Sequence, residues 1–204
     1  ELHEGAPPAA VRDRLADLVR TTSSEEIVAM EQQLMQEGMT VEEIKGMCDL
    51  HSQVLREILD ERVGTQTVPG HPAHTFGLEN AAIAEVTGEM RRLLAQLDAS
   101  NLDATLARWR ELHERLMQVE QHYARKENVL FPYLERHGVT GPSQVMWGKD
   151  DDIRVLLKSL REALTAEGSS AEEWRVVARE IAMPLLAQVE EMIAKEERIL
   201  LPMA

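Results

Sequence analysis

The segment from Val119 to Glu135 constrains the fold most, because a similar segment recurs at Val189–Ala204. The first reads VEQHYARKENVLFPYLE and the second VEEMIAKEERILLPMA, with valine, glutamate, alanine, leucine and proline at equivalent positions. Both segments have helix-forming composition and end in the same way. Two such helices in one chain predict a helical bundle with two equivalent halves.

The two copies differ on one helix face. His122 and Lys126 of the first copy become Met192 and Glu196 in the second. Residues four apart lie on the same side of a helix, so each pair projects from one face. We therefore look for the functional residues on this face.

Composition limits the class of protein. The chain has 204 residues, only 3% of them aromatic, and a net charge of −14, which argues against nucleic acid or an anionic membrane surface as a partner. No apolar run reaches the roughly 20 residues of a membrane span. The single cysteine, Cys48, permits no internal disulfide and suits a reducing compartment, so we expect a cytoplasmic protein.

Capping residues and helix breakers divide the chain near residue 70. Residues 1–70 are predicted to form a small three-helix unit, and the sequence TQTVPGHPAHT at residues 65–75 is predicted to link the two units. Residues 71–204 are predicted to form an all-α, up-down-up-down four-helix bundle, in which Pro184 should kink the last helix. The four bundle helices are expected at about Thr75–Leu97, from Asn101 or Asp103 to Arg136, at Ser143–Ala166, and from Ala171 to the C-terminus.

These segments resemble a known pairing of domains. HYARKENVLFPYLE and MIAKEERILLPM resemble the two signature helices of the hemerythrin-like, HHE cation-binding family. EIVAMEQQLMQEGMTVEEIKGMCDLH and PGHP resemble the helical domain of unknown function that often precedes this bundle in bacteria. The resemblance implies non-haem iron used for sensing oxygen or nitric oxide, or for repair of iron centres. A sensory domain commonly follows the bundle, and none is expected in this chain.

The family pattern is only partly present. It places an HxxxE pair on each signature helix and a histidine on each of the other two helices. His122 and Glu196 match this pattern, and Asp150 is an acceptable substitute for a histidine. A standard di-iron centre is therefore not expected. The other positions of the pattern hold Asn80, Lys126 and Met192.

Three hypotheses follow for the inward face. In the first, Lys126 pairs with Asp150 and Glu196 across the bundle, and this polar core replaces the charge of a metal. In the second, His122 and Met192 are the axial ligands of a b-type haem. In the third, non-haem iron binds to His122, Glu196 and Asp150.

Glu127 is a further candidate ligand in the third hypothesis. It lies about 140° around the helix from His122, so it would face inward only if the helix bulges. Under either iron hypothesis the protein would be a sensor or ligand-binding module for a diatomic gas or a redox signal, working with a homodimer partner or an output domain. No nucleophile with its base is visible, so we do not expect an enzyme.

A second group of histidines surrounds the linker. His71 and His74 could bind zinc or seal a haem edge together with His51 and His3. The competing interpretation, a capping or hinge role at the start of a helix, is favoured.

Overall fold

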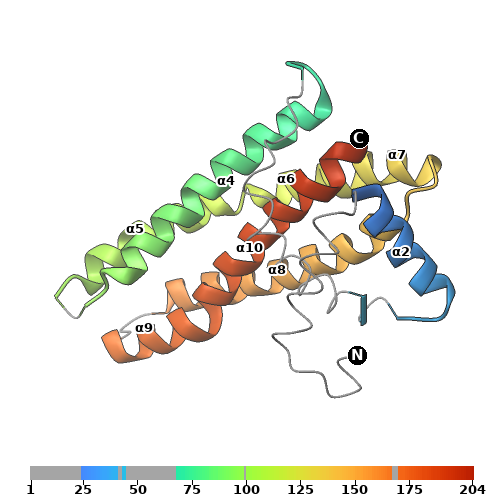
Figure 1. The fold of residues 1–204 in the computed structure, drawn as a ribbon. Helices are drawn as coiled ribbons and strands as arrows, with labels where there is room; N and C mark the ends of the chain where they lie inside the picture. The colour runs from blue at the N-terminus through green and yellow to red at the C-terminus, as the bar shows by residue number, and fades with distance from the viewer. Residues whose placement is uncertain (1–23, 41–42, 45–67, 99, 167–169) are drawn as a thin grey trace, which may run out of the picture.

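The computed structural model describes residues 24–40, 43, 44, 68–98, 100–166 and 170–204. Every regular element within these ranges is helical, which confirms the predicted all-α fold (Figure 1). Of the predicted N-terminal unit, the structure describes helix α2 (Ser24–Gln36) and a few residues after it. Apart from residues 43 and 44, the other predicted helices of that unit lie outside the described residues.

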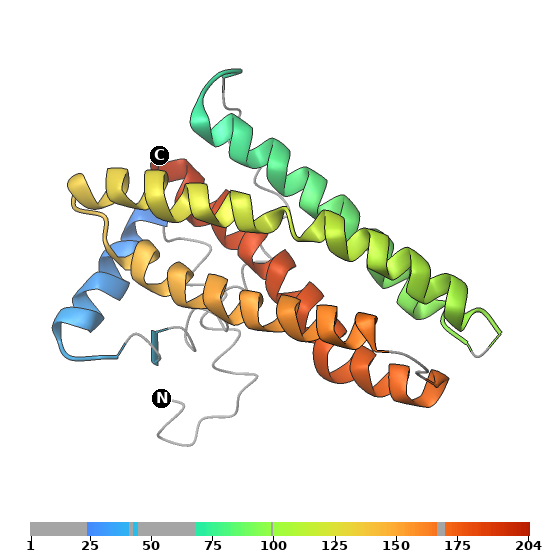
Figure 2. The ribbon, with the colours of Figure 1, turned by 180° about the vertical axis from the view of Figure 1, so that it is seen from behind.

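The bundle consists of four rods that run up, down, up and down (Figures 1 and 2). The start of the first rod, the end of the second and the C-terminus all lie at one end of the bundle. The first rod is α4 (Pro72–Ala95), and the third is α8 (Gly141–Thr165). The second comprises α5 (Leu102–Leu116), α6 (Val119–Arg125), η2 (Lys126–Leu130) and α7 (Phe131–Arg136). The fourth comprises α9 (Ala171–Val177), η3 (Ala178–Ala182), α10 (Met183–Lys195), η4 (Glu196–Leu200) and η5 (Leu201–Met203).

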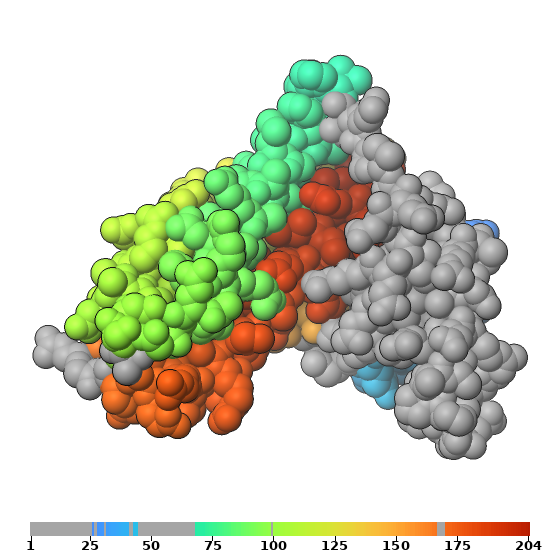
Figure 3. Space-filling view, turned by 60° about the vertical axis from the view of Figure 1, so that its left-hand side comes forward, coloured from blue at the N-terminus to red at the C-terminus, as the bar shows by residue number. Residues whose placement is uncertain are grey.

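The core lies between all four rods. Trp109 of α5 and Trp174 of α9 are fully buried and meet edge to face, with ring centroids 6.0 Å apart. Helix α4 packs against α5 on one side and α10 on the other, and Figure 3 shows α4 lying along the last rod. None of the helices in the described ranges is long and apolar enough to cross a membrane.

Three π turns interrupt the second and fourth rods, and each stands just before a proline. The residue preceding Pro132, Pro184 and Pro202 in each case donates its backbone N–H to the carbonyl five residues back. Proline has no N–H and its ring collides with the carbonyl four residues earlier, so a wider turn accommodates it within the helix. The expected disturbance at Pro184 therefore takes the form of the π turn η3.

The second rod is not the single helix predicted to Arg136. Around Met117 and Gln118 the backbone tightens, with Gln118 N–H donating to Arg115 O at 3.1 Å and Gln121 N–H to Gln118 O at 3.0 Å. These bonds span three residues, as in a 3₁₀ turn. No proline or glycine marks this position, which explains why the sequence pattern did not reveal it.

Helix α2 docks on the end of the bundle. It contacts α8 and η4, and the Gln32 side-chain amide donates to Gly138 O at 3.1 Å and to Thr140 Oγ1 at 3.0 Å. At Gly141 an added Cβ would lie 3.3 Å from Gln32 Cγ. A small residue at Gly141 therefore permits the close approach of α2.

A glycine in a left-handed conformation ends α7. Gly138 has φ of +85°, and the N–H groups of Gly138 and Val139 donate back to Glu135 O and Leu134 O, both at 3.0 Å. These two bonds form a Schellman motif, in which glycine is favoured because it has no Cβ. Glycine at this position stops the helix before α8 begins.

We expect Gly138→Ala to lower the free energy of unfolding by about 1–2 kcal/mol, because alanine is strained at positive φ. Gly88→Ala is the matched control, since Gly88 lies inside α4 with open space around its Cβ position. That substitution should raise stability by about 0.5–1 kcal/mol. Chemical denaturation of both variants tests this pair of predictions. Equal changes in the free energy of unfolding would contradict the role given to Gly138 in the turn.

Candidate functional site

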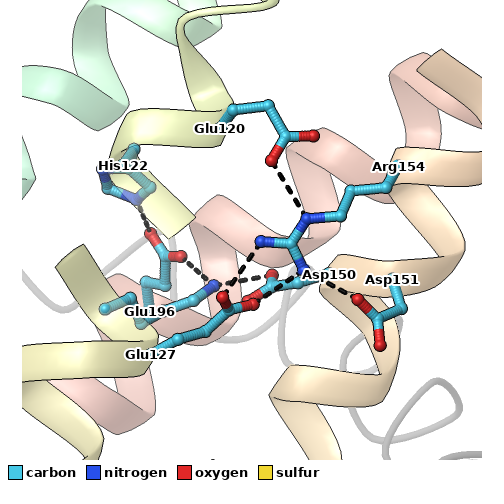
Figure 4. A network of polar contacts seen from close by, with 8 residues as sticks. Glu120, His122, Glu127, Asp150, Asp151, Arg154 and Glu196 are labelled. Atoms are coloured by element: carbon cyan, nitrogen blue, oxygen red, sulfur yellow. Dashed lines mark hydrogen bonds and ion pairs between the residues drawn. The ribbon is translucent and has the colours of Figure 1, made fainter. Parts of the chain in front are cut away.

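A buried lysine lies at the centre of the candidate site. The Lys126 Nζ atom donates to Asp150 Oδ1 at 2.8 Å and to Glu196 Oε1 at 2.6 Å (Figure 4). All three side chains have relative exposures of 0%. The ammonium also lies 4.2 Å from the centre of the Tyr123 ring, in cation–π geometry. The predicted contact of Lys126 with Asp150 and Glu196 is therefore confirmed.

The sequence repeat positions this contact. Lys126 is the first residue of η2 and Glu196 is the first residue of η4. Each begins the π turn that accommodates the proline of its own copy. Equivalent residues of the two copies thus carry opposite charges and meet across the core.

A chain of hydrogen bonds leads from this centre to the protein surface. The His122 ring contacts Glu196 Oε2 through Nε2 and Glu79 Oε2 through Nδ1, each at 2.8 Å. The other Glu79 oxygen accepts from Arg125, whose side chain is about half exposed. Both nitrogens of the His122 ring are therefore already bound by carboxylates.

At each of these groups, burial shifts the pKa one way, and the oppositely charged neighbours shift it the other way. Burial raises the pKa of Glu196, but the Lys126 charge and the bonds from His122 and Lys126 outweigh it and lower that pKa to about 2. Burial dominates at Asp150 and raises its pKa to about 7 despite Lys126. Burial lowers the pKa of His122, but Glu196 and Glu79 more than compensate, so the net shift is upward.

The four central side chains can balance their own charge. With His122 protonated, Lys126 and His122 carry two positive charges, and Asp150 and Glu196 carry two negative charges. A buried charge is tolerated when it is paired and hydrogen-bonded. The weakest member is Asp150, whose Oδ2 atom has no hydrogen-bond partner among the described residues.

Glu127 faces inward because of the π turn. It follows Lys126 in η2 and has a relative exposure of only 6%. Both of its carboxylate oxygens accept from the Arg154 guanidinium, at 2.8 and 3.0 Å. Arg154 also bonds to Glu120 and Asp151 (Figure 4). Glu127 thus belongs to a second ion-pair cluster beside the central one.

Two other predicted positions are buried in the bundle. Asn80 of α4 is fully buried, and neither atom of its side-chain amide has a well-formed hydrogen bond within the described ranges. Met192 of α10 is 2% exposed and belongs to the hydrophobic core, one helical turn before Glu196. The cavity that reaches His122 is lined by residues of the first two rods and does not include Met192.

Two other histidines among the described residues have structural roles. His71 caps α4, because its Nδ1 accepts from the backbone N–H of Ala73 at 3.2 Å, and this confirms the capping interpretation. His113 Nε2 lies 3.0 Å from Leu157 O, and burial lowers the pKa of this histidine. His3 and His51 lie outside the described residues, so the predicted cluster with His74 is not tested.

The donor set does not fit a metal ion while Lys126 stays in place. Carboxylate and imidazole ligands hold a metal such as zinc at about 2.0–2.2 Å, and the ammonium already occupies the point on which Asp150 and Glu196 converge. Across the described ranges, no group of three or more His, Cys, Asp or Glu side chains has an arrangement that could hold a metal ion. A metal here would require Lys126 to move away.

Comparison with known families places this site in a wider class. Residues 71–204 match the family described as the hemerythrin HHE cation binding domain, and residues 1–61 match a family of unknown function, DUF438. The chain therefore belongs to the hemerythrin HHE family, and this membership implies cation binding by the bundle. The two matches agree with the arrangement predicted from the sequence. No curated protein and no solved structure matched the chain.

Arg154 and Glu79 are among the residues of the polar network that were not identified from the sequence. Arg154 lies one turn after Asp150 on α8, so its place on the inward side could have been inferred from their spacing. Glu79 precedes the predicted ligand position Asn80, but its contact with His122 joins different rods. A long-range contact of this kind has no signal in a single sequence.

The pKa shifts predict a stability maximum at mildly acidic pH. The Glu196 contribution, about 3 kcal/mol, is present above pH 4.5 and is lost as the pH falls toward 2. The His122 contribution is present below pH 6.5 and is lost as the pH rises through its raised folded-state pKa. Asp150 also makes the protein less stable as the pH rises from about 4 to 7, because its carboxyl group binds a proton more tightly in the folded than in the unfolded protein. We therefore expect the highest stability near pH 4, where the gain from Glu196 and the loss from Asp150 balance.

Thermal unfolding from pH 3 to 9 tests this profile. Glu196→Gln should flatten the acidic side, and His122→Gln should flatten part of the alkaline side. His74→Gln, at the start of α4, is the control that should leave the shape unchanged. Unchanged profiles in both His122→Gln and Glu196→Gln would contradict the assigned shifts.

Proposed function

We propose that this bundle is a metal-independent binding module of the hemerythrin HHE family, in which the Lys126 ammonium takes the place of a resident iron. The observation that supports this proposal is the contact of Lys126 with Asp150 and Glu196 at 2.8 and 2.6 Å, with no exposure to solvent. The cation implied by the family is then supplied by the chain itself.

This arrangement gives the module a fixed geometry. Lys126 connects the second rod to Asp150 on α8 and to Glu196 on the fourth rod. His122 extends the connection to Glu79 on α4. All four rods are therefore held by one polar cluster, which can set their relative positions without redox chemistry.

Iron binding is the second candidate function, and it is favoured by the family and by the convergence of the donors. Non-haem iron would use His122, Asp150 and Glu196 after displacement of Lys126, and a diatomic gas or redox signal would then act at the iron. Haem would need His122 and Met192 as ligands, and His122 Nε2 would have to leave Glu196. Both forms require the central cluster to open.

Absorption spectroscopy with added haemin, together with ferrous iron binding under anaerobic conditions, tests the proposal on the full chain. We expect no Soret band that depends on His122 or Met192, and no stoichiometric iron uptake. His122→Ala and Met192→Leu are the variants for the haem arm, and Asp150→Asn is the variant for the bare-iron arm. A Soret band lost in both haem variants, or iron uptake lost in Asp150→Asn, would overturn the metal-independent module.

A further inference from the structure

A cavity of about 370 Å³ lies beside the central cluster, between α4 and the junction of α5 with α6. It is separate from the Lys126 position and reaches the cluster only through the His122 ring. Ligand sites for small molecules span about 300–1,000 Å³, so this cavity suits a small organic molecule.

The cavity has an apolar floor. Val86 and Leu116 line it and are also part of the hydrophobic core, with exposures of 5% and 1%. Ile83 and Ala82 extend this apolar surface along α4 toward solvent. A short aliphatic chain on this floor would remove apolar area from water.

The polar lining has a positive excess. Its charged side chains are Glu79, Arg115 and Arg125, and His122 adds a proton-binding group. The two Glu79 oxygens are already bound, one by Arg125 and the other by His122. The Arg115 side chain has no hydrogen bond or ion pair with another described residue. The exposed Arg115 thus brings an uncompensated positive charge to the lining of this cavity, in a protein whose net charge is −14.

We propose that this cavity binds small aliphatic monocarboxylates. The ligand carboxylate would accept from the Arg115 guanidinium, which can donate two parallel hydrogen bonds, and from the side-chain amides of Gln118 and Gln121, which also line the cavity. The aliphatic chain would lie on Ile83, Val86 and Leu116. The site gives the binding module a ligand class, but it depends on the cavity alone and not on whether the core holds a metal.

The cavity borders the tightened turn around Gln118. It also contacts Glu79 and His122, which lead to Glu196 in the core. A bound carboxylate would therefore lie against both the least regular point of the second rod and the surface end of the polar chain. Through Glu79 and His122, a ligand in the cavity would affect the hydrogen bonds of the central cluster.

Calorimetric titration of the full chain with hexanoate tests the proposal, with hexanol and hexylamine as probes of the same chain length. Hexanoate should bind at least about tenfold more tightly than either, because a charge-assisted hydrogen bond contributes a factor of about ten to a hundred. Equal binding of hexanol would overturn the carboxylate assignment, and so would the absence of hexanoate binding.

Two variants locate the site. Arg115→Gln should weaken hexanoate binding by about tenfold or more, and Ile83→Asp should abolish it by placing a charge on the apolar floor. Arg92→Gln is the matched control, because Arg92 is an exposed arginine on α4 outside the cavity. Circular dichroism confirms that each variant is folded. Unchanged affinity in both Arg115→Gln and Ile83→Asp would overturn this site, whatever the metal experiments give.

Discussion

Lys126→Met is expected to lower the free energy of unfolding by about 3–5 kcal/mol, because it leaves buried carboxylates without their cation. Methionine has nearly the length of lysine, so the loss of charge outweighs the loss of volume. For a chain of this size the change corresponds to a fall of about 6–20 °C in Tm. Thermal and chemical denaturation at neutral pH measure it.

The control is Lys158→Met, which removes an exposed lysine from α8. It should change stability by no more than about 0.5 kcal/mol. Adding Asp150→Asn and Glu196→Gln to Lys126→Met should recover part of the loss, because neutral amides need no buried counter-charge. Equal effects of Lys126→Met and Lys158→Met would show that the ammonium is not buried in this network.

Lys126→Glu is expected to convert the internal ion pair into a site that depends on divalent cations. The introduced carboxylate would join Asp150 and Glu196, which both contact the Lys126 ammonium in the wild-type protein. His122, which contacts Glu196, would be a fourth ligand. Like charges at short range make the metal-free variant unstable. A divalent ion bound only by the folded state would restore stability, by about 2.7 kcal/mol when its concentration is a hundred times the Kd.

Unfolding curves with and without Zn²⁺, Mn²⁺ or Co²⁺ test this result. The wild-type protein should show no shift in Tm, and Lys126→Glu should show a rise that saturates with metal concentration. Lys126→Gln is the control, because it removes the positive charge without adding a carboxylate ligand. The same metal dependence in the wild type, or none in Lys126→Glu, would contradict the exchange of an ammonium for a metal.

The sequence predicted the helical class and most rod boundaries because caps, glycines and apolar spacing are local signals. In the structure, Ser170 forms a capping box with Glu173, and Thr40 forms one with Glu43, and both pairs have the serine or threonine and glutamate three residues apart that mark a helix start in a sequence. The break near Gln118 was missed because no proline or glycine stands there. The π turns were not predicted, although each proline that they precede is visible in the sequence.

The central contact could be predicted because the repeat aligns Lys126 with Glu196. An inward-facing lysine needs an anion, and Asp150 and Glu196 were the acids already assigned to that face. The second cluster was not predicted, because Glu127 faces inward only after the π turn shifts the helix face. Its partner Arg154 and the partner of His122, Glu79, come from other rods, and such pairings depend on tertiary packing.

The most direct test of the central claim is the metal content of the wild-type protein. The protein would be produced in iron-supplemented medium and purified without oxygen or chelators, and elemental analysis would be combined with an absorption spectrum of the same sample. The internal ammonium predicts far less than one metal ion per chain and no Soret or charge-transfer bands. Stoichiometric iron or haem that is lost in His122→Ala would contradict the claim and show that the bundle opens around Lys126 to admit a metal.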